Sequence, residues 1–357
     1  MSGSVRIRMA EPGDREVILR LLGEMHGAGA ADRYEWLYLR NPHGRALTWL
    51  AVDESSGDVV GMTSLFPRFV YVGGKTELGA LGGDSYVVPA ARGRGLATRL
   101  HLVTREEMGR NGVQVAYGAP VPINLRALLA AGARVVSEFR RFTLLLGPSS
   151  ARRPDGATGG RTGAAGLARA LAEKASATVG LLSRLALSRA ITKYTISSVA
   201  EFGQEWDDWI ERLRWSYPVA CVRDRRYLTW RYLESPRRTQ VPFVVRRDER
   251  IVGLLVLEAR DARCAIVDLF VERSLRLLRV ALALAALRAR AMGCDAVDFS
   301  CTEFPGHRLA LTVSGFVLRE RSAPWMFHVL DSGDSERSRF LGGRRNWYAT
   351  AGDQDVT

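Results

Sequence analysis

The feature that most restricts the fold of this chain is a strand, a glycine-rich loop and a helix between Leu81 and Leu100. Ser85 to Val88 favours an extended strand that stops at Pro89, and Arg92 to Gly95 opens the helix. The first amide groups of a helix have no intrahelical acceptor and lie at the positive end of its dipole. Glycines allow an anion to approach these amides, so we expect the loop to hold a phosphate or pyrophosphate. A tight turn that carries arginines is the alternative.

The loop lacks the G-x-G-x-x-G spacing of dinucleotide-binding folds and the G-K-[ST] of a P-loop. It resembles motif A of the GCN5-related N-acetyltransferases, Q/R-x-x-G-x-G/A, with Arg92, Gly95 and Ala97 at the fixed positions. In that family the preceding strand meets the acyl-CoA thioester and pantetheine, and the loop binds the CoA pyrophosphate. The resemblance therefore implies acetyl-CoA or another acyl-CoA as co-substrate. The implied CoA-binding residues are Val87, Val88, Arg92, Gly93, Arg94, Gly95, Leu96, Ala97, Thr98 and Asn124.

The order of elements over residues 1–147 is also that of the acetyltransferase fold, and it predicts a mixed α/β (α+β) sheet flanked by helices. Alternating and β-branched runs mark the strands, and apolar stripes at helical spacing mark the helices. Strands are expected at residues 5–9, 47–53, 58–65, 68–72, 78–88, 113–117 and 135–146. Helices are expected near residues 17–22, 32–40, 96–110 and 124–131.

The second half of the chain repeats landmarks of the first. The run Trp36 to Pro42 is echoed by Trp230 to Pro236, and later glycine-containing landmarks recur at similar offsets. Near-constant spacing indicates a duplicated domain. Phe270 to Arg276, at the position of the loop, contains no glycine, so the second copy is expected to be degenerate and to shape the acceptor site.

Four segments follow from these patterns. We expect a catalytic acetyltransferase-like domain at 1–147, a linker with a basic connecting helix at 148–192, a degenerate copy at 193–332 and a tail at 333–357. The connecting helix is predicted to pack on a domain; an amphipathic helix on an anionic membrane surface is the alternative.

Acyl transfer from a thioester needs an amine without its extra proton, a donor for the oxyanion and a proton for the leaving thiolate. A backbone amide near Val87 or Val88 is the expected oxyanion donor. Asp84 is the candidate base, through a raised pKa, although it could simply cap a Gly82-Gly83 turn. Tyr86, on the strand that follows, is a further catalytic candidate. For the acid, the family often places a tyrosine after an N-x-x-A pattern.

That pattern is met by Asn124 and Ala127, but no tyrosine follows it. Tyr117 is a possible substitute, and water could protonate the thiolate instead. We expect the first helices to line the acceptor pocket, with His26, Trp36, Arg40 and His43 as candidates. His101, His307 and His328 are expected to be structural or solvent-facing.

Composition restricts the remaining classes. The chain has 357 residues and a net charge of +13, but the cations are scattered and no nucleic-acid motif accompanies them, so nucleic-acid binding is not expected. No signal peptide or membrane-spanning run is present, and no metal pattern is seen. The cysteines lack CxxC pairing and indicate a reducing cytoplasm. They are Cys221, Cys264, Cys294 and Cys301.

The sequence therefore predicts a cytoplasmic, tandem-domain enzyme, a monomer or homodimer, that moves an acetyl or similar group from CoA to a small-molecule amine such as an amino sugar. Two alternatives remain open. One is an aminoacyl-tRNA-dependent transferase on the same fold, and the other is a non-catalytic acyl-CoA-binding protein.

Overall fold

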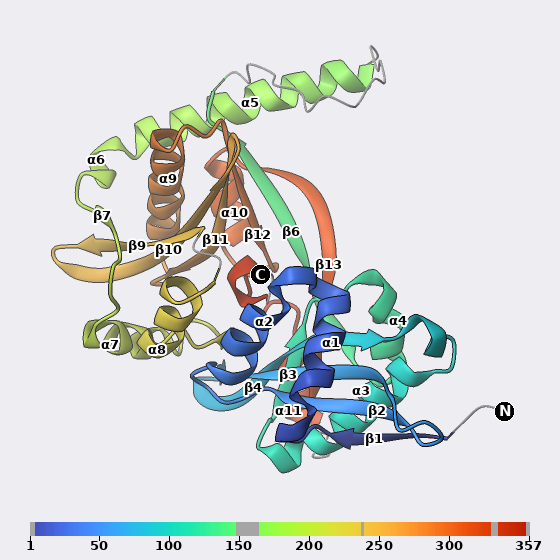
Figure 1. Cartoon of the computed structure of the whole chain (residues 1–357). Coiled ribbons are helices and arrows are strands. Elements are labelled where there is room, and N and C mark those ends of the chain that lie inside the picture. The colour runs from blue at the N-terminus through green and yellow to red at the C-terminus, as the bar shows by residue number, and fades with distance from the viewer. Residues whose placement is uncertain (1–3, 148–163, 237–238, 330–334, 355–357) are drawn as a thin grey trace.

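The computed structural model describes residues 4–147, 164–236, 239–329 and 335–354, and within them the strands form one mixed sheet of 13 strands (Figure 1). The strands are β1 (Val5–Met9), β2 (Leu47–Asp53), β3 (Val59–Val72), β4 (Lys75–Val87), β5 (Val115–Gly118), β6 (Arg134–Leu145), β7 (Thr195–Ser198), β8 (Val219–Cys221), β9 (Gln240–Arg247), β10 (Arg250–Arg260), β11 (Arg263–Val271), β12 (Ala296–Cys301) and β13 (Val317–Val329). The α-helices are α1 (Arg15–His26), α2 (Ala30–Arg33), α3 (Leu96–Glu107), α4 (Pro122–Ala130), α5 (Ala164–Ala186), α6 (Ser188–Ile191), α7 (Gln204–Leu213), α8 (Arg225–Leu228), α9 (Leu275–Ala291), α10 (His307–Val313) and α11 (Ser335–Leu341).

Helices cover both faces of the first-half sheet. Successive side chains of a strand point to opposite faces. Phe66 and Leu81 pack in the core that includes α1, whereas Leu65 and Ala80 pack in the core beneath α3. No helix in the described ranges is long and apolar enough to cross a membrane.

The elements expected from sequence are present, with one correction in β3. Two strands were expected between residues 58 and 72, but the structure has one, with Pro67 inside it. Proline cannot donate to a ladder and is tolerated where a strand edge is open. Pro67 lies in such a gap, because β2 pairs with β3 up to Leu65 and β8 pairs with it only from Val70.

The two halves exchange their last strands. The sheet order around the centre is β5-β13-β6-β12, so β13 pairs with β5 of the first half and β6 pairs with β12 of the second. β6 and β13 also pair with each other in antiparallel fashion. Each half therefore receives a strand from the other.

A symmetric pair of tryptophans joins the halves. Trp36 lies on the π-helical turn η3 (Tyr34–Leu39), and Trp230 lies on the equivalent turn η6 (Thr229–Leu233). Their rings stack at 4.5 Å, and each indole N–H donates to the other residue's carbonyl at 3.0 Å.

The segment expected as a tail is packed into the core where the structure describes it. Trp347, Tyr348 and Asp353 are each no more than 2% exposed. Thr350 forms a bridge with Cys301 at the end of β12. The C-terminal part of the chain is thus a structural element that contacts both halves, since Trp347 also packs against Tyr117 of β5 and Arg337 pairs with Glu77 of β4.

Candidate active site

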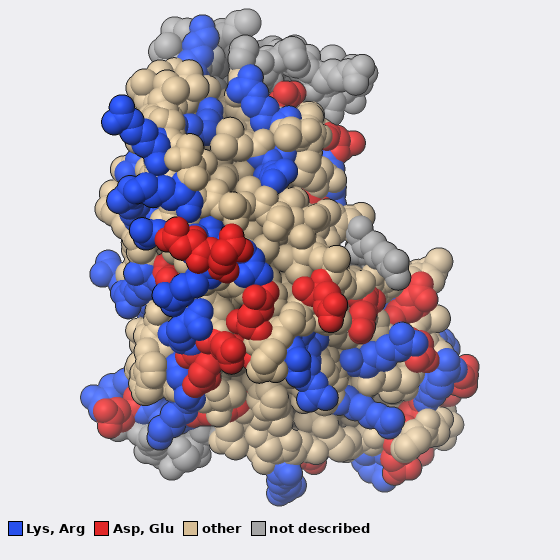
Figure 2. Space-filling model, turned by 90° about the vertical axis from the view of Figure 1, so that its left-hand side faces the viewer, with Lys and Arg blue, Asp and Glu red and all other residues tan. Residues whose placement is uncertain are grey.

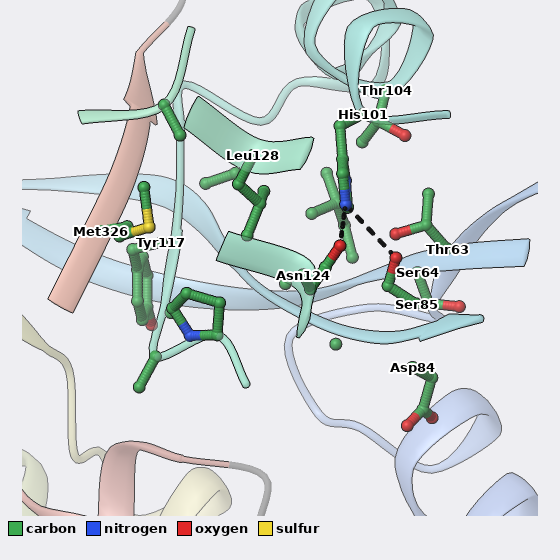
Figure 3. Close-up of a pocket in the computed structure, with 18 of the residues that line it drawn as sticks. Thr63, Ser64, Asp84, Ser85, His101, Thr104, Tyr117, Asn124, Leu128 and Met326 are labelled. Atoms are coloured by element: carbon green, nitrogen blue, oxygen red, sulfur yellow. Dashed lines mark hydrogen bonds between the residues drawn. The ribbon is translucent and has the colours of Figure 1, made fainter. Parts of the chain in front are cut away.

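A cavity opens where β4 and β5 separate. The two parallel strands pair only between Gly79–Leu81 and Val115–Tyr117. Beyond this point they diverge around a cavity of about 390 Å³, which α1, α3, α4 and β13 help to enclose (Figure 3). β13 contributes Met326 and Phe327, so the strand exchange supplies part of the cavity wall.

The glycine loop has the geometry expected of an anion-binding helix start. Gly93 and Gly95 have φ values of 78° and 72°, a region that favours glycine, and a Cβ on either would meet no atom within 4 Å. The first helical bond of α3 runs from the Arg99 amide to the Gly95 carbonyl (3.1 Å), so the amides of residues 96–98 have no intrahelical acceptor. Arg92 Nε donates to the Val87 carbonyl at 3.0 Å. Open space thus lies beside Gly93 and Gly95, and of the predicted CoA-binding residues Asn124 lines the cavity.

The geometry of β4 distinguishes the two candidate oxyanion donors. The Val88 amide donates to the Val60 carbonyl of β3 at 3.0 Å. Opposite pairs in an antiparallel ladder alternate between bonded and non-bonded, so the amide of Val87, opposite Gly61, faces away from β3. Of the two, Val87 therefore has the amide directed toward the separation of β4 and β5.

Asp84 lies in an irregularity of β4 and binds several donors. The β3–β4 register shifts between Met62 and Ser64, and Asp84 has a φ of 45°. Its carboxylate is buried and accepts hydrogen bonds from Arg33 (2.8 Å), Tyr38 (2.8 Å) and His26 (2.9 Å).

Both sequence interpretations of Asp84 need correction. Gly82 and Gly83 lie within β4, so Asp84 does not cap a turn there. Burial alone would raise the pKa of Asp84, but the hydrogen bond from His26 and the charge and hydrogen bonds of Arg33 outweigh it and hold that pKa below its usual value. Asp84 is therefore an anion that fixes its neighbours.

His26 is the one of these donors that reaches solvent. Its side chain is 33% exposed and lines the cavity, while Arg33 is buried. Because an ionised carboxylate only accepts, His26 Nε2 donates the 2.9 Å bond, and in a neutral ring Nδ1 is then the atom with the lone pair. A neutral imidazole oriented by a carboxylate can accept a proton. Sequence reasoning selected His26 but did not foresee this contact with Asp84.

His101 also lines the cavity and has partners there that the sequence did not indicate. Its Nε2 lies 3.0 Å from Asn124 Oδ1 and 3.3 Å from Ser85 Oγ (Figure 3). Burial lowers the pKa of His101, so the ring is neutral near pH 7. Thr104, one turn further along α3, is 6% exposed, and its hydroxyl has no partner among the described residues. The helix therefore offers polar groups to a ligand in the cavity.

The two tyrosine candidates are placed differently. Tyr86 lies outside the cavity wall and donates to Glu24 at 2.9 Å, a bond that raises the pKa of Tyr86. Tyr117 lines the cavity, and its hydroxyl is buried close to Cys221 and Arg68. Burial raises the pKa of Tyr117 well above its usual value. Both phenols therefore keep their protons near neutral pH.

Three other acceptor-pocket candidates lie away from the cavity. Trp36 is held by Trp230, and Arg40 is exposed at the end of η3. His43 is buried, accepts from the Phe69 amide at Nδ1 (3.1 Å) and contacts Asp224 through Nε2 (3.2 Å). These residues do not line the cavity.

The remaining sequence candidates are structural or lie outside the described side chains. His307 is buried in the second half, and burial lowers its pKa to about 4. The side chain of His328 lies outside the described residues. The four cysteines are buried and unpaired, and no group of three potential metal ligands occurs among the described residues.

Comparison with known proteins agrees with this geometry. Residues 6–126 match the family model described as an acetyltransferase (GNAT) domain. No curated protein matches the sequence.

Solved structures of low sequence identity share the fold. A GCN5-related N-acetyltransferase from Anabaena variabilis is 14% identical with a TM-score of 0.63, over 91% of this chain and 73% of that one. A probable N-acyltransferase from Enterococcus faecalis is 13% identical with a TM-score of 0.63, over 92% and 73%. Eis1 from Mycobacterium abscessus is 14% identical with a TM-score of 0.56, over 92% and 74%. Residues 6–126 therefore match a GNAT acetyltransferase domain, and most of the chain shares its fold with these solved structures.

Proposed function

We propose that this protein is an acetyl-CoA-dependent N-acetyltransferase that acts on a primary amine of a small molecule, such as an amino sugar or a related metabolite. The observation that carries the proposal is the separation of β4 and β5, which opens a cavity with the His26–Asp84 pair in its wall. β4 borders this cavity and continues along the chain into the glycine loop. We further expect a cytoplasmic enzyme.

In this proposal the loop holds the CoA pyrophosphate. The amides of Leu96, Ala97 and Thr98 and the positive end of the α3 dipole favour a dianionic group. Gly93 and Gly95 leave the space in front of them open. Asn124, His101 and Thr104 supply hydrogen-bonding groups for the pantetheine arm along the cavity.

The reaction then needs one proton acceptor and one oxyanion donor. His26 Nδ1 removes a proton from the ammonium group of the acceptor, and Asp84 holds the ring while it becomes charged. The neutral amine attacks the thioester carbon, and the Val87 amide stabilises the oxyanion. The carbon–nitrogen bond forms, the carbon–sulfur bond breaks, and the second nitrogen proton is released.

The leaving thiolate takes its proton from water in this scheme. α4 presents Leu128 and Leu129 where the family often has a tyrosine. The Tyr117 hydroxyl is the alternative acid, since it is protonated and its ring lines the cavity.

We also infer that the second half is a degenerate copy of the first. The elements β9-β10-β11-α9-β12-α10-β13 follow the order of β2-β3-β4-α3-β5-α4-β6. The turns η3 and η6 and the exchanged strands support the same pairing of parts.

Calorimetric titration with acetyl-CoA tests the proposal. Gly95→Trp should abolish binding, because it fills the loop and strains a residue of positive φ. Gly57→Trp is the matched control: its φ is 78°, it also has open space, and it lies in the β2–β3 turn. This variant should bind as the wild type does.

Turnover over an amine panel completes the test. Binding without turnover would favour a non-catalytic acyl-CoA-binding protein. Absence of binding in the wild type would contradict the proposal, and retention of charged tRNA would then favour the aminoacyl-transferase alternative.

A further inference from the structure

Among its described side chains, helix α5 packs on β6 and α10 through small residues and turns the large apolar ones outward. Gly180 and Ser183 are buried. A Cβ at Gly180 would lie 2.6 Å from Leu144 Cδ1 of β6, so the helix approaches β6 closely at this residue. In a helix that docks only on its own domain, the large apolar residues face the core.

The outward residues form one patch, which we call the α5 leucine patch. Leu181, Leu182 and Leu185 are 49%, 58% and 60% exposed, and Val179 beside them is 41% exposed. Residues three and four positions apart are neighbours on a helix surface, so Leu181 and Leu182 both adjoin Leu185. Contiguous apolar surface of this kind marks an interaction site, whereas single exposed leucines do not.

The surrounding chain is basic. From Lys174 to Ala200 the sequence contains Lys174, Arg184, Arg189 and Lys193 and no acidic residue. Arg290 of α9 adds a further cation near Arg184, and burial together with that cation lowers the pKa of Arg184. On the side of the molecule shown in Figure 2, Lys and Arg predominate in the upper part and most acidic side chains lie below them.

We propose that the α5 leucine patch docks on an anionic lipid bilayer. A helix with apolar residues on one side and flanking cations lies in the plane of the interface, where the acyl region takes the leucines and the anionic headgroups take the cations. A second copy of the chain would bring the same cations against one another. A nucleic acid would pair with the cations but leave the leucines in water.

The position of α5 is compatible with an enzyme that works while docked. α5 lies at the end of the molecule formed by the second half, whereas α1, α3 and α4, which border the cavity, lie in the first half (Figure 1). This inference does not depend on the proposed reaction.

Sedimentation of the full-length protein with vesicles tests it. We expect binding to vesicles that contain phosphatidylglycerol, little binding to pure phosphatidylcholine, and weaker binding in high salt. Leu182→Glu should lower the partition coefficient at least about tenfold, because it replaces buried apolar area with a charge. Arg189→Gln and Lys193→Gln should each lower it about fivefold.

Leu129→Glu is the matched control, because Leu129 is 47% exposed on α4 of the first half. It should bind vesicles as the wild type does. A wild type that ignores anionic vesicles, or vesicle binding that Leu182→Glu leaves intact, would overturn the proposal. A dimer in light scattering that Leu182→Glu dissociates would assign the patch to a second copy instead.

Discussion

The two halves of this protein contain the same separation of two parallel strands, but only one of them is open. In the first half, β4 and β5 part after Leu81 and enclose the cavity. In the second, β11 and β12 pair from Arg263 to Ile266, and the C-terminal segment lies against the end of β12. There the Thr302 amide donates to the Ala349 carbonyl at 2.9 Å. The C-terminal segment therefore contacts both β11 and β12, at the place equivalent to the cavity of the first half.

Both separations hold a buried aspartate bound by an arginine and a tyrosine. In the first half Arg33 and Tyr38 bind Asp84, as described above. In the second, Asp268 accepts from Arg223 (2.8 Å) and from Tyr232 (2.9 Å). The further donor differs: it is the half-exposed His26 in the first half and the buried Thr350 of the C-terminal segment in the second (2.9 Å). The same polar cluster can therefore border a cavity, as in the first half, or stabilise a packed segment, as in the second. We call this C-terminal segment, residues 347–353, the plug.

The largest expected effect lies on His26. Glutamine at this position can still donate to Asp84 but cannot accept a proton, so His26→Gln should lower kcat/KM by about 10²- to 10⁴-fold. Thermal unfolding should change little. Thr350→Val changes the corresponding donor of the second half and should leave kcat/KM unchanged while lowering stability. Full activity in His26→Gln would remove the proposed base.

The next effect concerns the two arginines. Arg223→Met leaves Asp268 and Asp353 buried without their cation and should lower the free energy of unfolding by about 3–5 kcal/mol. Arg33→Met should cost less, because it removes the cation of one buried carboxylate and not of two, and Asp84 adjoins a cavity. Urea denaturation of both variants measures the difference. Equal losses of unfolding free energy in the two variants would mean that the plug does not make the second half more dependent on Arg223 than the first half is on Arg33.

A smaller effect tests how closely the plug fits. A Cβ at Gly352 would collide with the Tyr232 hydroxyl and lie 3.2 Å from the Asp268 side chain. Gly352→Ala should therefore lower the free energy of unfolding by about 1–3 kcal/mol. Gly23→Ala, within α1 and with no atom within 4 Å of the new Cβ, should raise it by up to about 1 kcal/mol. A neutral Gly352→Ala would show that the segment packs loosely.

The smallest effect is a difference between Asp84 and Asp353 in how their ionisation changes stability with pH. The lowered pKa of Asp84 means that its ionised form stabilises the fold above about pH 4 and that this stability is lost as pH falls through the folded-state pKa. Burial and the nearby Asp268 raise the pKa of Asp353 despite Arg223, so its ionisation opposes folding as pH rises above about 4.

Asp84→Asn should therefore lose stability at pH 7 and show a flatter acid limb. Asp353→Asn should lose about 1 kcal/mol or less at pH 7. Melting temperatures between pH 3 and pH 7 measure both. A larger loss of stability at pH 7 in Asp353→Asn than in Asp84→Asn would mean that the ionised form of Asp353, and not that of Asp84, stabilises the fold more.

Local patterns predicted most elements of the fold, because strands, turns and helix starts depend mainly on residues that are close together in the sequence. The glycine loop is the clearest case, since Gly93 and Gly95 take the positive φ values that only glycine adopts readily. The exchange of β6 and β13 could not be predicted in this way. Which strand lies beside β5 depends on contacts between residues far apart in the chain, and both strands carry suitable patterns.

The candidate site shows the same division. Asp84 and His26 were named from sequence, but their contact depends on how α1 packs over β4. Arg33 was missed because a single arginine in a helical stretch gives no sign of burial, although its place beside an aromatic run could have prompted the question. His101 was set aside for lack of a sequence partner, yet Asn124 is brought to it by the fold.

The exchanged strands have a consequence for synthesis of the chain on the ribosome. Met326 of β13 pairs with Gly118 of β5, which leaves the ribosome 208 residues earlier. Until β13 emerges, β5 and β6 lack the strand that lies between them, and an open strand edge invites pairing with other chains. The edges of β5 and β6 therefore stay exposed until the second half has been synthesised. We expect a chaperone or slow, late consolidation to matter more for this protein than for a GNAT domain that completes its own sheet.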